Sequence, residues 1–410
     1  MTFSNPWLLL AMIGTLVLYH LELFATWLNL SALSTTVPRE LEGTVTEEDH
    51  EKALEYARVS ANFDVLQSTC MLALFYAFWF LGGFGAIDRA VAGLHGGAIG
   101  SGLAVVGAVV VLQQLAELPF ELYDTFGIEQ RFGFNKMTMG TFILDRVKGT
   151  ILAVVLGAPL LGLLLWLFGR FEMAALYGWL LMTAFSLLMT CLAPRFILPL
   201  FFKFQPLGDE TLRAEILQLS TRVDFPVADV SVVDGSRRST KANAFFTGFG
   251  KLKRIALFDT LLQHSRQEIL AVLAHEVGHC KRGHVPKQIA LSLTTSALLF
   301  ALLHFALRDP RLCEAFGVNS PSIAWGLVFF GIIYQPVSMV LGWISSHLSR
   351  KYEFEADAFA RQAMNGPDAM ASALVKLSKD HLSNPTPHPF YVFLHYSHPP
   401  VLQRLAALRA

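Results

Sequence analysis

The feature that most limits how this chain of 410 residues can fold is a set of seven long apolar stretches. A bilayer core about 30 Å thick needs roughly 20 helical residues to cross it, and each stretch is close to that length. Hydrophobic residues make up 53% of the chain and charged residues 16%, a balance typical of integral membrane proteins. The stretches run near residues 6–30, 65–84, 101–119, 150–168, 173–193, 288–307 and 322–343. The sequence therefore predicts a multi-pass, mostly α-helical membrane protein.

The basic residues divide unequally between the two sides that seven crossings define. Of the 32 Lys and Arg residues, 28 fall on the side of the long segment 194–287 and four on the other. Without that long segment the balance is still 14 to four, and the rule is most reliable for short loops. We therefore expect the charge-rich side, with any site that its polar segments form, to face the cytoplasm. No positive charge precedes the first apolar stretch, so we expect it to remain as an uncleaved anchor. The membrane would be a bacterial inner membrane or the endoplasmic reticulum, depending on the source.

Two polar regions on the charge-rich side predict an extramembrane domain. The first has short strand-like runs at 230–233 and 255–258 and then a helix from about 266 to 281. The second begins with a helix that Asn365, Gly366 and Pro367 should end. Two spans separate the regions, so both lie on one side and can meet. The predicted divisions are 1–193 for five spans, 194–287 for the first polar region, 288–343 for two spans and 344–410 for the second polar region.

The strongest motif is His275-Glu276-Val277-Gly278-His279, which follows an apolar helical run. On a helix, residues four apart share a face, so both imidazoles can bind one ion while Glu276 stands beside the open coordination position. The alternative is the polar face of an ordinary helix. The motif predicts a hydrolytic zinc site in which Glu276 activates water.

A catalytic zinc needs a third protein ligand, and two candidates follow the motif. His284 stands nine residues after His275, whereas the metzincin pattern requires ten, where this chain has Val285. Glu353 is the better candidate, because Asp357 shares its helical face and can orient a ligand histidine from outside. The alternative for this segment is an acidic helix paired with neighbouring basic residues. The two motifs together predict one Zn²⁺ per chain, bound by His275, His279 and Glu353.

Several blocks outside the metal motifs carry a family resemblance. They lie at residues 118–120, 128–136, 199–201, 243–249, 334–337 and 396–400. With the two metal motifs, these blocks resemble the integral membrane zinc CAAX prenyl endoproteases, the type that also converts the yeast a-factor precursor, over nearly the whole chain. The smaller heat-shock membrane proteases share the zinc helices, but we do not expect them to match the other blocks.

The resemblance implies an architecture of seven transmembrane helices that enclose a water-filled chamber. A gluzincin-like α+β zinc metalloprotease domain, formed by the fifth loop and the C-terminal tail, would close its cytosolic end. Such a chamber gives a reason for the ionisable residues Glu22, Glu117 and His304 within apolar spans, because these groups are costly against lipid. Hydrogen bonding between helices is the alternative role for each.

The resemblance also implies further site residues. His398 would stabilise the oxyanion and Arg404 would bind a substrate carbonyl or the terminal carboxylate. Asn243, Ala244 and Phe245 resemble the edge strand that holds the substrate main chain in thermolysin-like enzymes. From local sequence alone, Asn243 and His398 would be turn residues, and Arg404 would lie on an exposed basic helix face.

The function that this resemblance implies is a membrane zinc endopeptidase that removes the three residues after a prenylated cysteine. The expected partners are a peptide or protein substrate and membrane lipid. The formal net charge is zero, which gives no reason to expect nucleic acid. The alternatives are a membrane quality-control protease without a prenyl requirement and, as a non-enzyme, a membrane receptor or zinc transporter.

Overall fold

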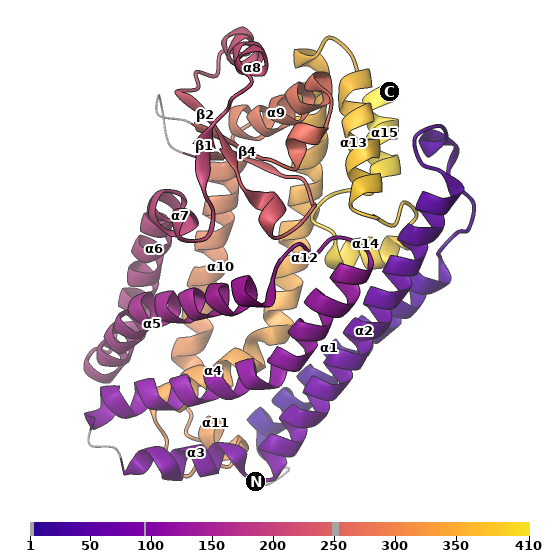
Figure 1. Cartoon of the computed structure of the whole chain (residues 1–410). Helices are drawn as coiled ribbons and strands as arrows, with labels where there is room; N and C mark the ends of the chain where they lie inside the picture. Colours follow the sequence, from indigo (N-terminus) through magenta and orange to yellow (C-terminus); the bar gives the residue numbers. More distant parts are fainter. Residues whose placement is uncertain (1–3, 94–95, 248–253) are drawn as a thin grey trace.

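The computed structural model describes residues 4–93, 96–247 and 254–410, and within them seven helices are long and apolar enough to cross a membrane. Each of the seven predicted spans overlaps one of these helices, which confirms the multi-pass prediction (Figure 1). The largest difference is at the second span, because its helix ends at Phe80 and the prediction ran to residue 84. The helices are α1 Pro6–Ser31, α2 Glu47–Phe80, α4 Gly97–Tyr123, α5 Met139–Arg170, α6 Ala174–Leu192, α10 His284–Ala306 and α12 Ile323–Ala363. Two π-helical turns extend α4 and α6, at Asp124–Glu129 and Ala193–Ile197.

Helix α12 is longer than the sequence analysis expected. It runs unbroken for 41 residues, across the predicted division at 343/344, and carries the last span and the second metal motif on one rod. It ends at Ala363, close to the predicted stop, and Asn365 then takes a left-handed conformation with φ 57°. The membrane part and the extramembrane part are therefore joined through continuous helix.

The membrane helices are packed loosely. Only 6 to 17% of the residues in their most apolar windows are buried. The accessible surface of 21339 Å² exceeds the value of about 16,000 Å² that a compact monomer of this mass would have. Helices that touch lipid on one side and inner space on the other account for both observations. The seven helices therefore enclose a chamber and do not form a solid bundle.

Three polar groups singled out in the spans have different surroundings. The Glu22 carboxylate is 3.0 Å from His395 Nε2, which belongs to α14 (Pro389–His395) outside the spans. Glu117 accepts a hydrogen bond from Gln113 Nε2 on its own helix at 3.0 Å. His304 makes an edge contact with Phe305. Contact with the chamber stays a prediction for all three.

An aromatic core closes the end of the chamber near the N-terminus. Two short helices, α3 (Gly83–Ala92) and α11 (Arg311–Ala315), cross that end in Figure 1. Phe316 stacks on Phe329 at 4.2 Å between ring centroids and on Trp79 at 4.6 Å. Hydrogen bonds from the indoles of Trp79 and Trp325 satisfy their buried N–H groups.

The extramembrane domain, made of β1–β4, α8, α9 and α13–α15, covers the opposite end (Figure 1). Its sheet has the order β1-β2-β4-β3, with β2 and β4 parallel and the other pairs antiparallel. The strands are β1 Phe204–Pro206, β2 Asp229–Val233, β3 Ala244–Thr247 and β4 Arg254–Phe258. The helices are α8 Glu210–Arg222, α9 Arg266–Lys281, α13 Asp368–Asp380 and α15 Val401–Arg409, besides α14, while short α7 (Leu198–Phe201) leads into the domain. The predicted strands and the 266–281 helix are confirmed.

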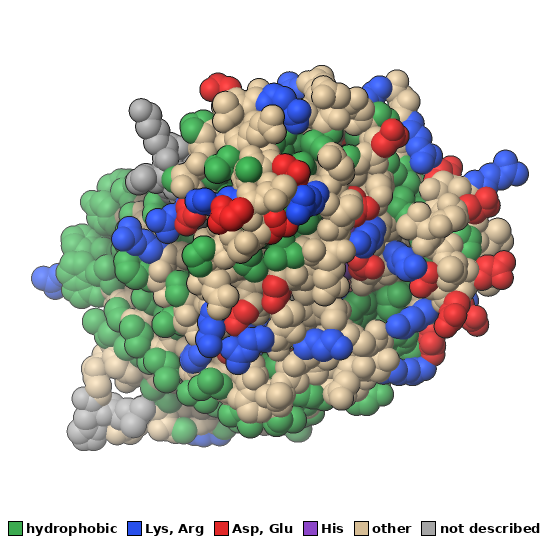
Figure 2. Space-filling view, turned by 45° about the horizontal axis from the view of Figure 1, so that its top comes forward, with side chains coloured by type: hydrophobic (Ala, Val, Ile, Leu, Met, Phe, Trp, Pro, Cys, Tyr) green, Lys and Arg blue, Asp and Glu red, His purple; other side chains and the backbone are tan. Residues whose placement is uncertain are grey.

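A single core joins the sheet to the helices from both polar regions. Leu257 of β4 and Leu273 of α9 are buried together with Leu405 of α15. Segments about 150 residues apart in sequence thus form one hydrophobic unit, as the even number of intervening crossings allows. The domain's face in Figure 2 shows interspersed basic and acidic side chains, with hydrophobic side chains gathered toward one side.

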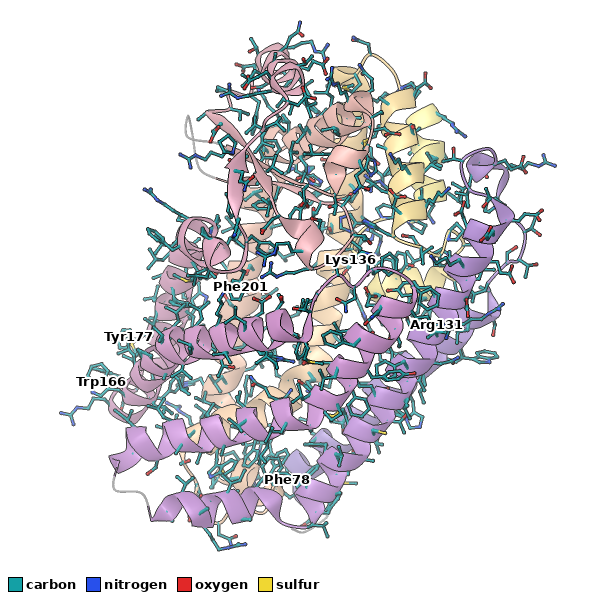
Figure 3. All side chains as sticks on the ribbon, in the orientation of Figure 1. Phe78, Arg131, Lys136, Trp166, Tyr177 and Phe201 are labelled. Carbon is teal, nitrogen blue, oxygen red and sulfur yellow. The ribbon has the colours of Figure 1, made fainter. Side chains whose placement is uncertain are left out.

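Aromatic residues gather where α5 ends and α6 begins. Phe171, between these helices, makes edge contacts with Trp166 at 5.3 Å and Tyr177 at 5.5 Å. Figure 3 places Trp166 and Tyr177 far from Lys136 and Phe201, which lie near the junction with the extramembrane domain. Such aromatic clusters are typical of a membrane–water boundary.

Candidate metal centre

Helix α9 brings the two predicted histidine ligands together. Its start is fixed by a capping box in which Ser265 and Glu268 satisfy each other's backbone N–H groups. His275 and His279 follow on one face, and their Nε2 atoms are 3.1 Å apart. Two nitrogens bound to one tetrahedral metal ion stand about 3.3 Å apart, given bonds near 2 Å. The spacing of the histidines therefore suits a shared metal ion.

Helix α12 carries the third predicted ligand. The carboxylate of Glu353 is 3.2 Å from His279 Nε2 and 3.5 Å from His275 Nε2, and one ligand atom from each residue lies within 4.8 Å of the other two. In the part of the chain that the structure describes, this is the one group of three His, Cys, Asp or Glu side chains able to share an ion. The buried oxygen Glu353 Oε2 accepts no hydrogen bond among the described residues, although the charged Arg404 Nη1 lies 3.3 Å from it.

The close approach of the two helices depends on the glycine inside the motif. A Cβ at Gly278 would lie 3.1 Å from Ala356 Cα and 3.2 Å from the carbonyl oxygen of the same residue. These are backbone atoms of α12, which cannot move aside without shifting the helix. Gly278 therefore allows α12 to bring Glu353 to the histidines of α9.

Asp357 and Arg404 support the ligands from behind. His275 Nδ1 is 2.8 Å from Asp357 Oδ1, the contact that the sequence predicted. Arg404 donates to both oxygens of Asp357, at 2.7 and 2.8 Å, and its Nη1 is 3.3 Å from Glu353 Oε2. Arg404 is 8% exposed, so it does not belong to an exposed basic face. These contacts give it a positioning role, and its binding to substrate stays a prediction.

Glu276 and His398 lie beside the ligands. Burial raises the pKa of the Glu276 carboxyl, an effect that nearby histidines partly oppose. His398 Nε2 is 3.5 Å from Glu353 Oε1 while 64% of its side chain is accessible. Its Nδ1 pairs with Ser397 Oγ at 3.0 Å. A proton acceptor and an accessible imidazole therefore flank the ligands, as expected of a hydrolytic site.

Strand β3 is an edge of the sheet, and the predicted substrate-binding residues lie on it or just before it. Phe245 pairs with Ala256 of β4, so the other edge of β3 has no strand partner among the described residues. Asn243 precedes the strand, and its side chain accepts a hydrogen bond from the backbone of Ala244 at 2.8 Å. Gly248 and Phe249 of the same sequence block lie outside the described residues.

The structure also shows contributions that the sequence analysis missed. Arg350 of α12 donates to the carbonyls of Val392 and Tyr396, and so holds the segment that carries His398. His284 was rejected as a ligand, yet it contacts His279 from outside the site. Its position five residues after His279 indicated that it could lie near the site. Spacing alone could not show which way its side chain points.

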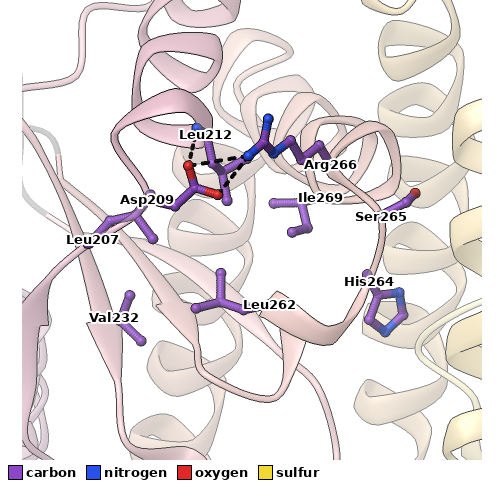
Figure 4. A pocket seen from close by; sticks show the side chains of 10 residues that line it. Leu207, Asp209, Leu212, Val232, Leu262, His264, Ser265, Arg266 and Ile269 are labelled. Atoms are coloured by element: carbon purple, nitrogen blue, oxygen red, sulfur yellow. Dashed lines mark hydrogen bonds and ion pairs between the residues drawn. The ribbon is translucent and has the colours of Figure 1, made fainter.

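A separate cavity of about 580 Å³ lies between the first turns of α8 and α9. Figure 4 shows Asp209 and Arg266 paired at its edge, with the apolar side chains of Val232 and Leu262 below them. None of the three metal-ligand candidates lines it. The cavity is therefore distinct from the metal centre.

A two-histidine, one-glutamate site with an adjacent acid, carried by seven membrane helices, defines a membrane metalloprotease. Family models match nearly the whole chain: the CAAX prenyl protease N-terminal region of five membrane helices matches residues 26–203, and peptidase family M48 matches residues 206–410. The chain belongs to peptidase family M48, within its CAAX prenyl protease branch.

Individual relatives agree along their full length. The chain is 35% identical to the CAAX prenyl protease 1 homolog of Arabidopsis thaliana, covering 96% of this chain and 95% of that protein. It is 32% identical to CAAX prenyl protease 1 of Saccharomyces cerevisiae, covering 98% and 95%. The crystal structure of S. mikatae Ste24p matches with a TM-score of 0.94 at 32% identity, covering 99% of both chains. These matches do not favour the quality-control and transporter alternatives.

Proposed function

We propose that the metal is zinc, one per chain, and that the protein is a zinc endopeptidase. Two imidazole nitrogens and a carboxylate are the donor set of catalytic zinc sites that keep one position open. When bound, zinc supplies Lewis acidity that acidifies water and polarises a carbonyl. The support is the convergence of His275, His279 and Glu353 from two helices.

In this proposal each neighbouring residue has a separate task. Glu276 accepts the proton of the attacking water and passes it to the departing amine, which its partly buried position permits. His398 donates a hydrogen bond to the oxyanion. The free edge of β3 binds the substrate main chain as an added strand, with Asn243 at its start.

The proposed substrate is a protein or peptide that ends in a prenylated cysteine and three further residues, which are removed. The observation that carries this proposal is the match to CAAX prenyl proteases along nearly the full length of the chain. The candidate metal site belongs to the domain that covers one end of the membrane helices. The chamber offers apolar surface to a prenyl chain, and each buried methylene contributes about 0.8 kcal/mol. We expect the lipid to act mainly through binding, and so to lower KM with little change in kcat.

The test compares matched peptides with and without a farnesyl group on the cysteine, in one detergent. A lower KM for the farnesylated peptide, and cleavage directly after its cysteine by mass spectrometry, supports the proposal. The Glu276→Gln protein serves as the inactive control. Equal KM and equal kcat for both peptides would contradict the CAAX assignment and leave a general membrane peptidase.

A further inference from the structure

His284 reaches the metal centre because the chain reverses just before it. Helix α9 ends at Lys281, and Gly283 takes a left-handed conformation with φ 67° before α10 begins at His284. In an unbroken helix His284 would point about 140° away from His279. The turn at Gly283 instead places its ring against the outer side of His279.

The contacts of His284 form a chain that leads away from the metal centre. Its Nδ1 is 3.0 Å from His279 Nδ1, and its Nε2 is 3.0 Å from Glu355 Oε2. The ring is 1% exposed and stacks on Tyr352 at 4.3 Å with an angle of 12°. Both ring nitrogens thus have a defined partner, and the stacking fixes the plane of the ring.

Hydrogen-bond chemistry allows one direction along this chain when a metal is bound. His279 Nε2 faces His275 and Glu353, so it must be free of hydrogen to act as a ligand. His279 Nδ1 then carries the hydrogen and donates it to His284 Nδ1, which leaves His284 Nε2 to donate to Glu355. The opposite direction would put a hydrogen on His279 Nε2 and block the ligand.

We propose that His284 and Glu355 are positioning residues that hold His279 in its metal-binding tautomer and orientation. The inference rests on the proposed zinc function and extends it by assigning the outer support of the second histidine. His284 is not itself a ligand, because it contacts the ring nitrogen of His279 that faces away from His275 and Glu353. The centre thus has two outer supports, Asp357 for His275 and the His284–Glu355 pair for His279.

The test measures zinc content and the rate of zinc loss to a chelator in purified full-length protein. Glu355→Ala removes a partly exposed acceptor, with 34% of the side chain accessible, and leaves the core intact. We expect zinc affinity to fall 10- to 100-fold, the range for outer partners of metal ligands. Glu355→Gln keeps an acceptor oxygen and should lose less. Glu210→Ala, which removes an exposed acid from α8 of the same domain, is the matched control and should behave as the parent.

His284→Phe retains the stacking on Tyr352 but removes both nitrogens, and thermal unfolding verifies that the variant is folded. Because Glu355 acts through His284, a variant that combines His284→Phe with Glu355→Ala should lose no more zinc than His284→Phe alone. In cobalt-substituted protein, His284→Phe and Glu355→Ala should each change the visible absorption spectrum. Parental zinc affinity and an unchanged cobalt spectrum in Glu355→Ala would overturn the inference. A parent that binds no stoichiometric zinc would instead refute the proposed function.

Discussion

The two histidine ligands differ in what supports their outer nitrogens. His275 contacts a carboxylate, Asp357, that Arg404 holds through two hydrogen bonds. His279 contacts a second imidazole, and the charge of Glu355 lies one step further away. Arg404 Nη2 is also 3.4 Å from His275 Nδ1, so His275 is supported by an ion pair and His279 by another imidazole.

At the same scale, Glu276→Gln should separate metal binding from turnover. The substitution keeps the shape of the side chain and replaces none of the three ligand candidates. We expect parental metal content and a fall in kcat of about 10² to 10⁴, the range for loss of a general base. Metal analysis and peptide hydrolysis on one preparation measure both. Undiminished hydrolysis would refute the role of Glu276, and His275→Ala, which should lose metal as well, provides the contrast.

Among the elements, α9 and α12 depend most on each other, because the centre exists only where they cross. Neither helix carries all three proposed ligands, since two of them belong to α9 and one to α12. Ligand distances in a metal site must agree with the expected values to about 0.2 Å, so the crossing must be accurate. Its accuracy depends on packing at Gly278 and on the secure start of α9.

Gly278→Val should damage the site without removing a ligand. The Cβ of the new side chain would lie only 3.1 to 3.2 Å from backbone atoms of α12, and overpacking of this kind costs about 1 to 3 kcal/mol. We expect lower metal content and a lower melting temperature. Gly342→Ala on α12 is the control, because a Cβ there meets nothing within 4 Å. Full metal content in Gly278→Val would show that the helices tolerate separation.

Glu268→Ala should destabilise the start of α9 in a pH-dependent way. Burial raises the pKa of Glu268, but hydrogen bonds from Ser372 and Ser265 outweigh it and bring the pKa below the ordinary value. The ionised group therefore stabilises the fold at neutral pH, by about 1 to 2 kcal/mol. This contribution is present above the ordinary range near pH 4.3 and is lost as the pH falls below it.

Thermal unfolding of Glu268→Ala and the parent at several pH values measures this effect. The difference should be full at pH 7 and should shrink on acidification below about pH 4. Glu210→Ala, with an exposed carboxylate at the start of α8, should show little difference at either pH. A difference for Glu268→Ala that does not change with pH would assign its cost to packing.

At the scale of the whole molecule, distant segments fix which parts share a side of the membrane. Lys379 of α13 is 2.8 Å from Asp49, near the start of α2, and donates to the carbonyl of Thr44 at 3.3 Å. The loop after the first span and the C-terminal tail must therefore meet on one side. The charge distribution suggests that this side is cytoplasmic.

Single cysteines near Thr46 and Ser378, in a cysteine-free background, test this topology. Both should react with an impermeant reagent from the cytoplasmic side of oriented vesicles, and neither from the other side before lysis. A cysteine in the α5–α6 connection, near Phe171, should show the opposite pattern. Labelling of the first two positions from different sides would contradict the fold, and labelling of both from the outer side would contradict the orientation alone.

Much of this architecture was predictable, because the requirements that decide it are local. A span must be apolar and long, and the apolar run with its pair of histidines at helical spacing indicated the α9 helix at 266–281. The continuity of α12 was missed because composition changes from apolar to charged near residue 343. The change in composition marks where the helix leaves the membrane. The helix itself continues, because residues 343–363 contain no proline or glycine that would end it.

The outer support of the centre was less predictable, because it depends on tertiary packing. The periodicity of residues 401–409 could not show that Arg404 turns toward Asp357, since either face of so short a helix can be buried. The place of His284 depends on the left-handed turn at Gly283 and on its stacking with Tyr352. Spacing rules compare residues along one helix, and these contacts join different helices.

The division of the centre between α9 and α12 has a consequence for the newly made protein. Synthesis runs from the N-terminus, so His275 and His279 appear long before Glu353, with two membrane crossings in between. Arg404 and His398 follow Glu353 in the sequence and are made later still. With the proposed ligand set, a growing chain therefore has no complete metal centre until α12 has been made.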